Sequence, residues 1–262
     1  MFPLGLSSVY SICSFGAGVA GNVFAFVLFV SPIPTFRRII RSQSTEQFSE
    51  LPYIYGLLNC LICLWYGTPI VTPGIILVFT VNSIGGVFQL AYLTIFIIYA
   101  ERTKKVNRVC FSRYYKMVFN AIKLTLTVSF VQLKTLGWLL GVFAVFAIIV
   151  SVSIFVFQPP TRQIFVGYLS VFSLISMFAS PLFIINLVIK TRSVEYMPFY
   201  LSLATFLMSL SFFAYGLLLY DMFISVPNGI GAVLGIVQLV LYFYISGRSG
   251  EEPRTPLLES YA

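Results

Sequence analysis

The sequence predicts an all-α membrane protein in which seven transmembrane helices form two parallel three-helix bundles joined by an inversion linker helix. Three observations lead to this prediction: the composition, the number of long apolar segments and an internal repeat. Apolar residues make up 59% of the 262 residues and charged residues only 9%, whereas a soluble domain carries roughly 25% charged residues. A chain so poor in charge requires lipid as its solvent, and the mean hydropathy of +0.96 agrees with this.

Seven apolar segments are long enough to cross a bilayer, whose hydrocarbon core requires about 20 residues per helix. They are residues 9–34, 52–71, 74–99, 135–157, 163–189, 198–219 and 223–246. All but one of the 16 Lys and Arg residues fall on one side of the membrane, and the exception is Arg162. Because basic loops stay in the cytosol, the N-terminus is expected outside or in a lumen and the C-terminus in the cytosol. The net charge of +8 follows from these loops and does not indicate a nucleic-acid partner.

An internal repeat relates the two halves of the chain. The paired features are Ser31-Pro32 with Ser180-Pro181, Leu51-Pro52-Tyr53 with Met197-Pro198-Phe199, Tyr66-Gly67 with Tyr215-Gly216, and an Asn-x-Ile-Gly motif at Asn82 and Asn228. The second proline of each half lies 30 residues before its asparagine. Each repeat contains three helices, so a direct connection would invert the second repeat, and one extra helix restores the parallel orientation. This 3+1+3 plan is a transporter architecture.

These features divide the chain into five parts. They are a first triple-helix repeat at 9–107, a cytosolic insertion at 108–134, the linker helix at 135–157, a second repeat at 163–246 and a cytosolic tail at 247–262. The insertion contains an apolar run at 117–133, interrupted by Asn120, Lys123 and Gln132. As an eighth span, this run would place the basic loop of the second repeat on the wrong side of the membrane. We therefore expect a segment that lies on the surface or is disordered, and an error in the gene prediction is the alternative.

The motifs of the two repeats resemble those of the SWEET family of sugar uniporters. The motifs that carry the resemblance are Ser31-Pro32, Leu51-Pro52-Tyr53, Trp65-Tyr66-Gly67, Thr80-Val81-Asn82, Met197-Pro198-Phe199 and Pro227-Asn228-Gly229. The resemblance covers about 9–107 and 134–246, and the insertion departs from it, since the family has a short loop there. It implies facilitative sugar transport by alternating access, and homo-oligomers that are often trimers.

Four prolines and two asparagines are the first candidates for moving parts and for substrate contacts. Proline removes a backbone donor and kinks a helix, and the resemblance implies a hinge tetrad at the cytosolic ends of four helices: Pro32, Pro52, Pro181 and Pro198. Asn82 and Asn228 carry amides that both donate and accept hydrogen bonds, as a sugar hydroxyl requires. Polar residues within a membrane tend to face the bundle interior, although hydrogen bonding between helices is an alternative role for them.

The resemblance assigns further residues to the sugar pocket and to an outer gate. It implies that Asn59, Cys63, Met208 and Phe212 join Asn82 and Asn228 around the substrate, although core packing alone also explains Cys63 and Met208. A small Cys63 opposite an aromatic Phe212 resembles the monosaccharide-transporting clade I. Tyr66 and Asp221 match a pair that closes the outer gate.

Several further expectations concern mechanism and location. No charged residue lies centrally in any span of either repeat, and coupled carriers usually need such groups, so uncoupled facilitated diffusion is predicted. The resemblance to the family implies that the substrate is a monosaccharide such as glucose. No catalytic set, metal cluster or phosphate loop can be assembled, so neither an enzyme nor a cofactor is expected. An amino-acid carrier of the PQ-loop type is the main rival, although the chain contains no Pro-Gln dipeptide; a seven-helix receptor is the second.

Glu251-Glu252 ahead of Leu257-Leu258 resemble an acidic dileucine signal, which favours the tonoplast over the plasma membrane.

Overall fold

The computed structural model describes the backbone of residues 4–45, 48–99, 113–194 and 197–249, and every regular element within these ranges is an α-helix. The helices are α1 (Leu4–Val30), α2 (Ile33–Ser42), α3 (Leu51–Tyr66), α4 (Ile76–Tyr99), α5 (Arg113–Phe155), α6 (Pro159–Met177), α7 (Ala179–Thr191), α8 (Phe199–Leu218) and α9 (Met222–Ser249). Side chains are described for 9–45, 48–99, 132–194 and 197–247. The expected dileucine signal therefore lies outside the described residues.

Two of the spans are broken near a proline. The first span runs through α1 and α2 and breaks at Ser31-Pro32, and the fifth runs through α6 and α7 and breaks at Phe178, three residues before Pro181. Proline lacks the amide hydrogen that a continuing helix would use, so a break at this place is expected. Counting each broken pair once gives six helices long and apolar enough to span, together with the shorter apolar helix α3. The prediction of an all-α fold with seven transmembrane helices is confirmed.

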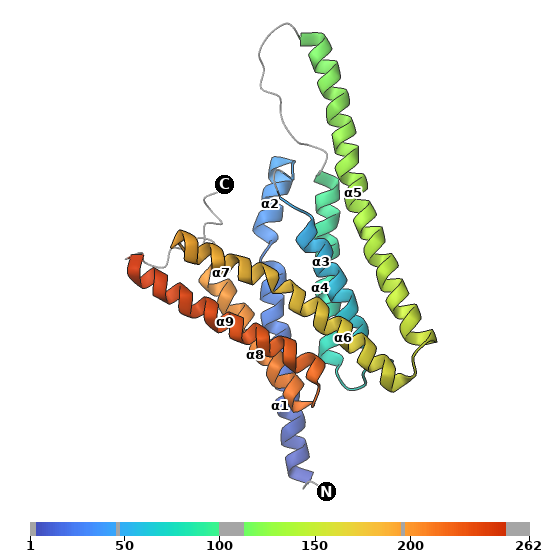
Figure 1. Ribbon diagram of the computed structural model, residues 1–262, viewed down its shortest axis with the longest axis vertical. Coiled ribbons are helices and arrows are strands. Elements are labelled where there is room, and N and C mark those ends of the chain that lie inside the picture. The colour runs from blue at the N-terminus through green and yellow to red at the C-terminus, as the bar shows by residue number, and fades with distance from the viewer. Residues whose placement is uncertain (1–3, 46–47, 100–112, 195–196, 250–262) are drawn as a thin grey trace.

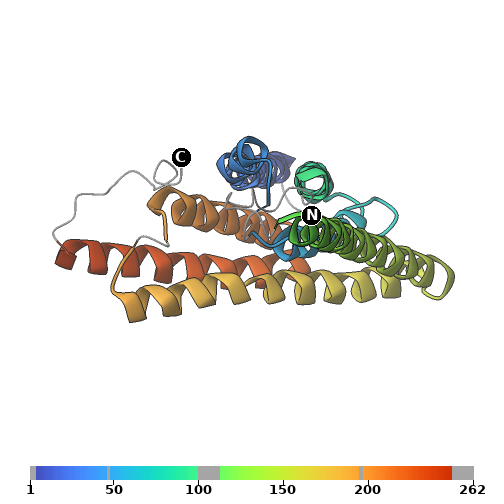
Figure 2. The same ribbon diagram turned by 90° about the horizontal axis from the view of Figure 1, so that it is seen from above.

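The seven spans form two groups and a linker (Figure 1). In the first bundle, α4 packs against both α1 and α3, and in the second bundle α9 packs against both α6 and α8. The bundles meet through two contacts, α1 with α8 and α3 with α6. In the repeat, α1 corresponds to α6 and α3 corresponds to α8. The contact of α1 with α8 is therefore equivalent to the contact of α6 with α3, as expected for two equivalent units. Seen from above, α1 and α4 lie in one layer and α6 and α9 in another (Figure 2).

Two glycines show that the repeats are equivalent in packing as well as in sequence. A Cβ on Gly67 would lie 2.6 Å from the backbone nitrogen of Phe79, and a Cβ on Gly216 would lie 2.7 Å from the nitrogen of Ser225. Phe79 and Ser225 are each the fourth residue of the helix that follows. In both repeats, therefore, a glycine lets the end of the second helix touch the backbone at the start of the third.

The linker helix differs from its expected bounds. It does not start at 135: α5 is one helix of 43 residues from Arg113 to Phe155, about 65 Å long at 1.5 Å per residue. A hydrocarbon core is about 30 Å thick, so α5 is longer than one span requires, and its first part extends past the neighbouring helices (Figure 1). Residues 113–134 are helical and not disordered, and a position of this segment on the membrane surface stays a prediction. No glycine or proline occurs in that range to end the helix, and residues 108–112 lie outside the described residues.

Side-chain contacts fix α5 to the first bundle. The Gln132 amide donates to the carbonyl oxygen of Ile97 in α4 at 3.2 Å, and the Lys134 ammonium lies 3.3 Å from the Glu50 carboxylate just before α3. Near the other end of α5, the Trp65 indole N–H of α3 donates to the Ser153 hydroxyl at 2.9 Å. The linker is therefore part of the first bundle as a packing unit.

Arg162, near the start of α6, is a capping residue for the end of α5. Its guanidinium donates to the carbonyl oxygens of Ser153 (2.8 Å), Phe157 (3.3 Å) and Ile154 (3.4 Å). These groups belong to the last turn of α5 and the residues after it, where helix carbonyls lack partners within the helix. Arg162 also donates to the carbonyl of Ile70 at 3.4 Å, so it joins α6, the linker and the first bundle.

Candidate functional site

The site is described relative to the two ends of the helices. We call the end at which α3 and α8 finish and α4 and α9 start the aspartate end, because Asp221 lies there, and the opposite end the proline end. The sequence motifs fall on both: the predicted gate pair lies at the aspartate end and the four prolines lie at the proline end.

A buried hydrogen bond joins the two bundles at the aspartate end. The Tyr66 hydroxyl donates to Asp221 Oδ2 at 2.7 Å, and the two residues are 1% and 8% exposed. Asp221 Oδ1 accepts the backbone N–H groups of Phe223 (2.9 Å) and Ile224 (3.2 Å), so the carboxylate caps the N-terminus of α9. The bond joins α3 of the first bundle to α9 of the second. The structure thus brings the predicted gate pair together.

An apolar cluster behind this bond also joins the bundles. We call it the aspartate-end cluster; its buried members are Ala25, Trp65, Tyr66, Val71, Ile75, Val78, Val81, Val166, Phe212, Tyr215 and Ile224. They come from α1, α3, α4, α6, α8 and α9 and from the loop after α3. Since both bundles contribute, opening this end requires the cluster and the Tyr66–Asp221 bond to separate together.

Asn82 and Asn228 occupy equivalent places in α4 and α9. Each lies six residues after the start of its helix, about 9 Å inward at 1.5 Å per residue. The amide nitrogen of each donates to the carbonyl four residues earlier, Asn82 to Val78 and Asn228 to Ile224, both at 2.8 Å. Val78 and Ile224 belong to the aspartate-end cluster, so both asparagines lie next to the same closed barrier. Each side-chain oxygen stays available, since none of the described residues donates to it.

Two of the other predicted pocket residues lie on one face of α3. Asn59 and Cys63 are 6% and 4% exposed, and the Cys63 thiol lies 3.7 Å from Asn59 Oδ1. Positions four and three residues apart share a helix face, so Asn59, Cys63 and Tyr66 form one stripe. Because Tyr66 reaches across to α9, this stripe faces the second bundle.

The two pocket residues predicted on α8 contact the aspartate-end cluster. Phe212 is 6% exposed and belongs to the cluster, and Met208 packs against it. A Cβ on Gly21 of α1 would lie 2.8 Å from the Phe212 ring, so one side of the ring is occupied by the contact between the bundles.

The four prolines lie where helices start or break. Pro32 follows α1, Pro52 is in the first turn of α3, Pro181 is in the first turn of α7 and Pro198 caps α8. Apolar clusters near them stay within one bundle: Phe36, Ile39, Tyr92 and Phe96 in the first, and Val188, Met197, Tyr242 and Ile245 in the second. At this end a hydrogen bond between the exposed hydroxyls of Tyr55 and Ser176 crosses between the bundles. Apolar packing between bundles is thus concentrated at the aspartate end.

Sequence reasoning did not identify Asn22 as a structural residue. Its amide nitrogen donates to the carbonyl oxygens of Gly18 (2.9 Å) and Leu77 (3.0 Å), and its oxygen accepts the Thr80 hydroxyl at 3.1 Å. Asn22 therefore fastens α1 to α4, the helix–helix role that was the alternative for Asn82. An asparagine within an apolar span was the available signal.

No group of three His, Cys, Asp or Glu residues suited to a metal ion occurs in the described part of the chain.

Comparison with known proteins identifies the family. The family model described as "Sugar efflux transporter for intercellular exchange" matches residues 15–104 and 164–249, which fall on the two repeats. The chain belongs to the SWEET family of sugar transporters. The family is a class of transporters and not of enzymes, as predicted.

Individual SWEET proteins are similar over nearly their whole length. Bidirectional sugar transporter SWEET2a of Sorghum bicolor is 58% identical over 255 residues, which are 97% of this chain and 94% of the relative. SWEET2 of Arabidopsis thaliana is 54% identical, with 96% and 95% covered. A solved structure of a eukaryotic SWEET transporter is 51% identical and has a TM-score of 0.79, covering 91% of this chain and 99% of its own. These likenesses do not favour the amino-acid carrier or the receptor.

Proposed function

We propose that this chain is a bidirectional, uncoupled carrier of monosaccharides that works by alternating access. The observation that carries the proposal is the pair of equivalent asparagines, Asn82 and Asn228, placed at equal depth next to a barrier closed by Tyr66 and Asp221. Each amide uses one N–H within its own helix and keeps its oxygen for a ligand. Two such groups, one from each bundle, suit a ring of hydroxyls that donate and accept hydrogen bonds.

The movement that we propose separates the bundles at one end while it joins them at the other. The described conformation is closed at the aspartate end, where the cluster spans both bundles, and we infer a path to the asparagines from the proline end, where apolar clusters stay within one bundle. The hinges proposed for the reverse movement are Pro32, Pro52, Pro181 and Pro198. Supporting this role, two of the spans already break beside Pro32 and Pro181.

We propose a monosaccharide rather than a larger sugar, with Asn59, Cys63, Met208 and Phe212 completing the site. The Cys63 side chain is small and leaves space opposite Phe212. The aromatic face of Phe212 can then pack against the apolar side of a pyranose. The aspartate end is proposed to face the outside or a lumen, since Arg162 is its only cation in the whole sequence. The tonoplast is our first choice of membrane, the plasma membrane is the second, and the working form is proposed to be a homo-oligomer, possibly trimeric in the manner of the family.

The test is sugar flux in cells that lack hexose carriers. We expect radiolabelled glucose to equilibrate through the protein in both directions, with little sucrose flux, and without electrogenic or proton-linked uptake. Asn82→Ala and Asn228→Ala should each lower glucose flux by about tenfold or more, because one lost hydrogen bond contributes roughly 0.5–1.5 kcal/mol and an unsatisfied partner costs more. Asn186→Ala, the same change at an exposed position of α7, is the matched control. Intact flux in both Asn82 and Asn228 variants, at equal expression, would show that the proposed pocket is wrong.

A further inference from the structure

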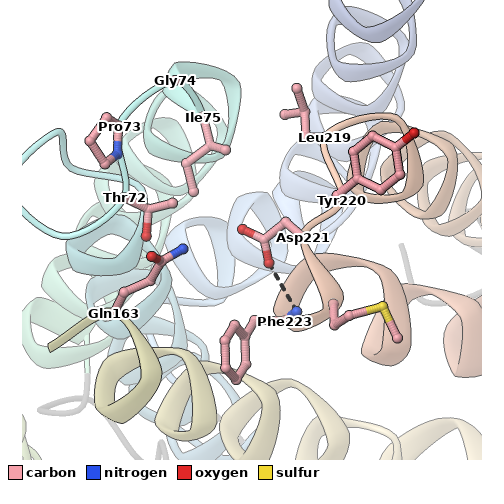
Figure 3. Close-up of a pocket in the computed structure, with 10 residues that line it drawn as sticks. Thr72, Pro73, Gly74, Ile75, Gln163, Leu219, Tyr220, Asp221 and Phe223 are labelled. Carbon is pink, nitrogen blue, oxygen red and sulfur yellow. Dashed lines mark hydrogen bonds between the residues drawn. The ribbon is translucent and has the colours of Figure 1, made fainter. Parts of the chain in front are cut away.

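A cavity of about 320 Å³ adjoins the closed gate at the aspartate end (Figure 3). Its walls come from the loop between α3 and α4, the first turns of α6, and the turn between α8 and α9: Thr72, Pro73, Gly74, Ile75, Gln163, Leu219, Tyr220, Asp221, Met222 and Phe223. Small-molecule sites usually occupy roughly 300–1,000 Å³, so the cavity is large enough for a small ligand. Because Asp221 both lines it and holds Tyr66, the cavity lies directly against the gate.

Two polar side chains of this cavity, Thr72 and Gln163, lie beside the Tyr66 hydroxyl. Thr72 is 5% exposed, and its buried hydroxyl forms no hydrogen bond of ordinary geometry with the described residues. The Gln163 amide is half-buried and faces the same tyrosine hydroxyl. Figure 3 shows the Thr72 hydroxyl and the Gln163 amide close together, with Asp221 on the other side of the hollow. Buried polar groups are nearly always hydrogen-bonded, and the Thr72 hydroxyl has only a loose contact with Tyr66, so the cavity offers polar groups that can bind a polar ligand.

The rim of the cavity has a shape that suits a ring. Gly74 has a φ of +92°, which only glycine adopts readily, and it leaves that part of the wall without a side chain. Tyr220 has a φ of +55°, a conformation that is uncommon for a bulky residue and is found at functional sites. This backbone directs the 85% exposed Tyr220 ring away from Gln163 (Figure 3) and towards Tyr10, on which it stacks with ring centroids 6.3 Å apart.

We propose that this cavity is a second sugar-binding subsite, which holds a monosaccharide against the closed gate before it passes to the asparagines or after it leaves them. The Gln163 amide and the Thr72 hydroxyl bind sugar hydroxyl groups, and the wall without a side chain at Gly74 leaves room for the sugar ring. Both bundles contribute to the wall, so opening of the gate changes the subsite and passes the sugar inward. This inference rests on the proposed function, because it takes the ligand from it.

Thiol protection tests the subsite in the full-length protein. Met222 lines the cavity and is 63% exposed, so Met222→Cys provides a reactive thiol, in a Cys13→Ser background that removes the exposed native cysteine. The rate of labelling by a membrane-impermeant maleimide is measured with increasing glucose, and with sorbitol as the osmotic control. The measurement is made in Asn82→Ala/Asn228→Ala protein, whose central site is disabled. Val156→Cys, which is 66% exposed and outside the cavity, is the matched control thiol.

We expect glucose to slow Met222→Cys labelling at least threefold, to leave Val156→Cys labelling unchanged, and to lose its effect when Thr72→Val and Gln163→Leu are added. Unslowed labelling of Met222→Cys, equal slowing of Val156→Cys, or slowing that survives Thr72→Val and Gln163→Leu would each overturn the subsite. The impermeant reagent labels only protein that has folded and reached the surface. A variant without labelling at Val156→Cys has therefore failed to fold, and Gln163→Leu alone then replaces the double change. Flux in the unmodified protein reports separately: absent glucose flux refutes the proposed function, whereas normal flux without protection refutes only the subsite.

Discussion

Removing the Tyr66 hydroxyl should shift the carrier towards the state that is open at the aspartate end. Tyr66→Phe keeps the ring in the aspartate-end cluster and deletes the 2.7 Å bond to Asp221, together with the weaker contacts of the hydroxyl with Gln163 and Thr72. Hydrogen bonds to charged groups contribute about 1.5–3 kcal/mol, and 1.4 kcal/mol corresponds to a factor of ten in an equilibrium constant. Asp221 keeps its two backbone partners, so α9 stays capped. The ratio of open to closed gate should therefore rise roughly ten- to hundredfold.

A native cysteine provides the assay. Cys63 is 4% exposed and lies about one turn of α3 inward from Tyr66, so a reagent applied at the aspartate end reaches it only when the gate opens. In a Cys13→Ser background, we expect Tyr66→Phe to raise the rate at which an impermeant thiol reagent modifies Cys63 by about the same ten- to hundredfold. Cys63→Ser in the same background identifies the signal.

The matched control removes a buried tyrosine hydroxyl from the opposite end. The Tyr92 hydroxyl donates to the carbonyl oxygen of Phe29 at 2.6 Å, in the first bundle and away from Asp221. Tyr92→Phe should leave Cys63 modification from the aspartate end unchanged or lower it. If Tyr66→Phe fails to accelerate modification, or Tyr92→Phe accelerates it equally, the bond between Tyr66 and Asp221 is not what holds the gate closed.

Two further predictions concern stability, and thermal unfolding of the purified protein in detergent measures both. Gly67→Ala places a Cβ 2.6 Å from the Phe79 nitrogen and should destabilise the fold by about 1–3 kcal/mol, as overpacking does; Gly137→Ala, where nothing lies within 4 Å, should not lower the unfolding temperature. Lys134→Ala leaves Glu50, which is 7% exposed, without the ammonium 3.3 Å away. Because Lys134 is half exposed, the expected loss is about 1–2 kcal/mol, below the roughly 3–5 kcal/mol of a fully buried pair. Adding Glu50→Gln should restore most of it, and an unchanged unfolding temperature in Lys134→Ala would show that the ion pair contributes nothing.

The architecture could be predicted from the apolar segments and the repeated motifs of the sequence. Apolar segments of about 20 residues must form helices in lipid, because each backbone polar group needs a partner within its own segment. The paired prolines and asparagines then revealed the repeat, and the contacts of α4 and α9 agree with it. The helical state of 113–134 was not predicted, because backbone groups outside lipid can pair with water and no local rule requires a helix there; with no glycine or proline between 113 and 136, nothing ends the helix.

The candidate site divides in the same way. Resemblance to a family placed Tyr66 opposite Asp221, and the structure joins them. No pattern in the sequence indicated Thr72 or Gln163, because their significance lies in being buried or half-buried beside the Tyr66 hydroxyl in the cavity wall. The pairing of Glu50 with Lys134 was equally hidden, since the two residues belong to different helices of a packed bundle.

The sequence by itself determined that this protein lies in a membrane and that it has an odd number of spans, seven. It also determined that the two halves are equivalent and that the chain belongs to a sugar-transporter family. These properties follow from composition and from spacings along one chain. Only the tertiary structure decided which end is closed, which bundle holds the linker and where polar groups stay unsatisfied. Those properties depend on distances between segments far apart in sequence, such as Tyr66 and Asp221, and packing sets such distances without leaving a local pattern.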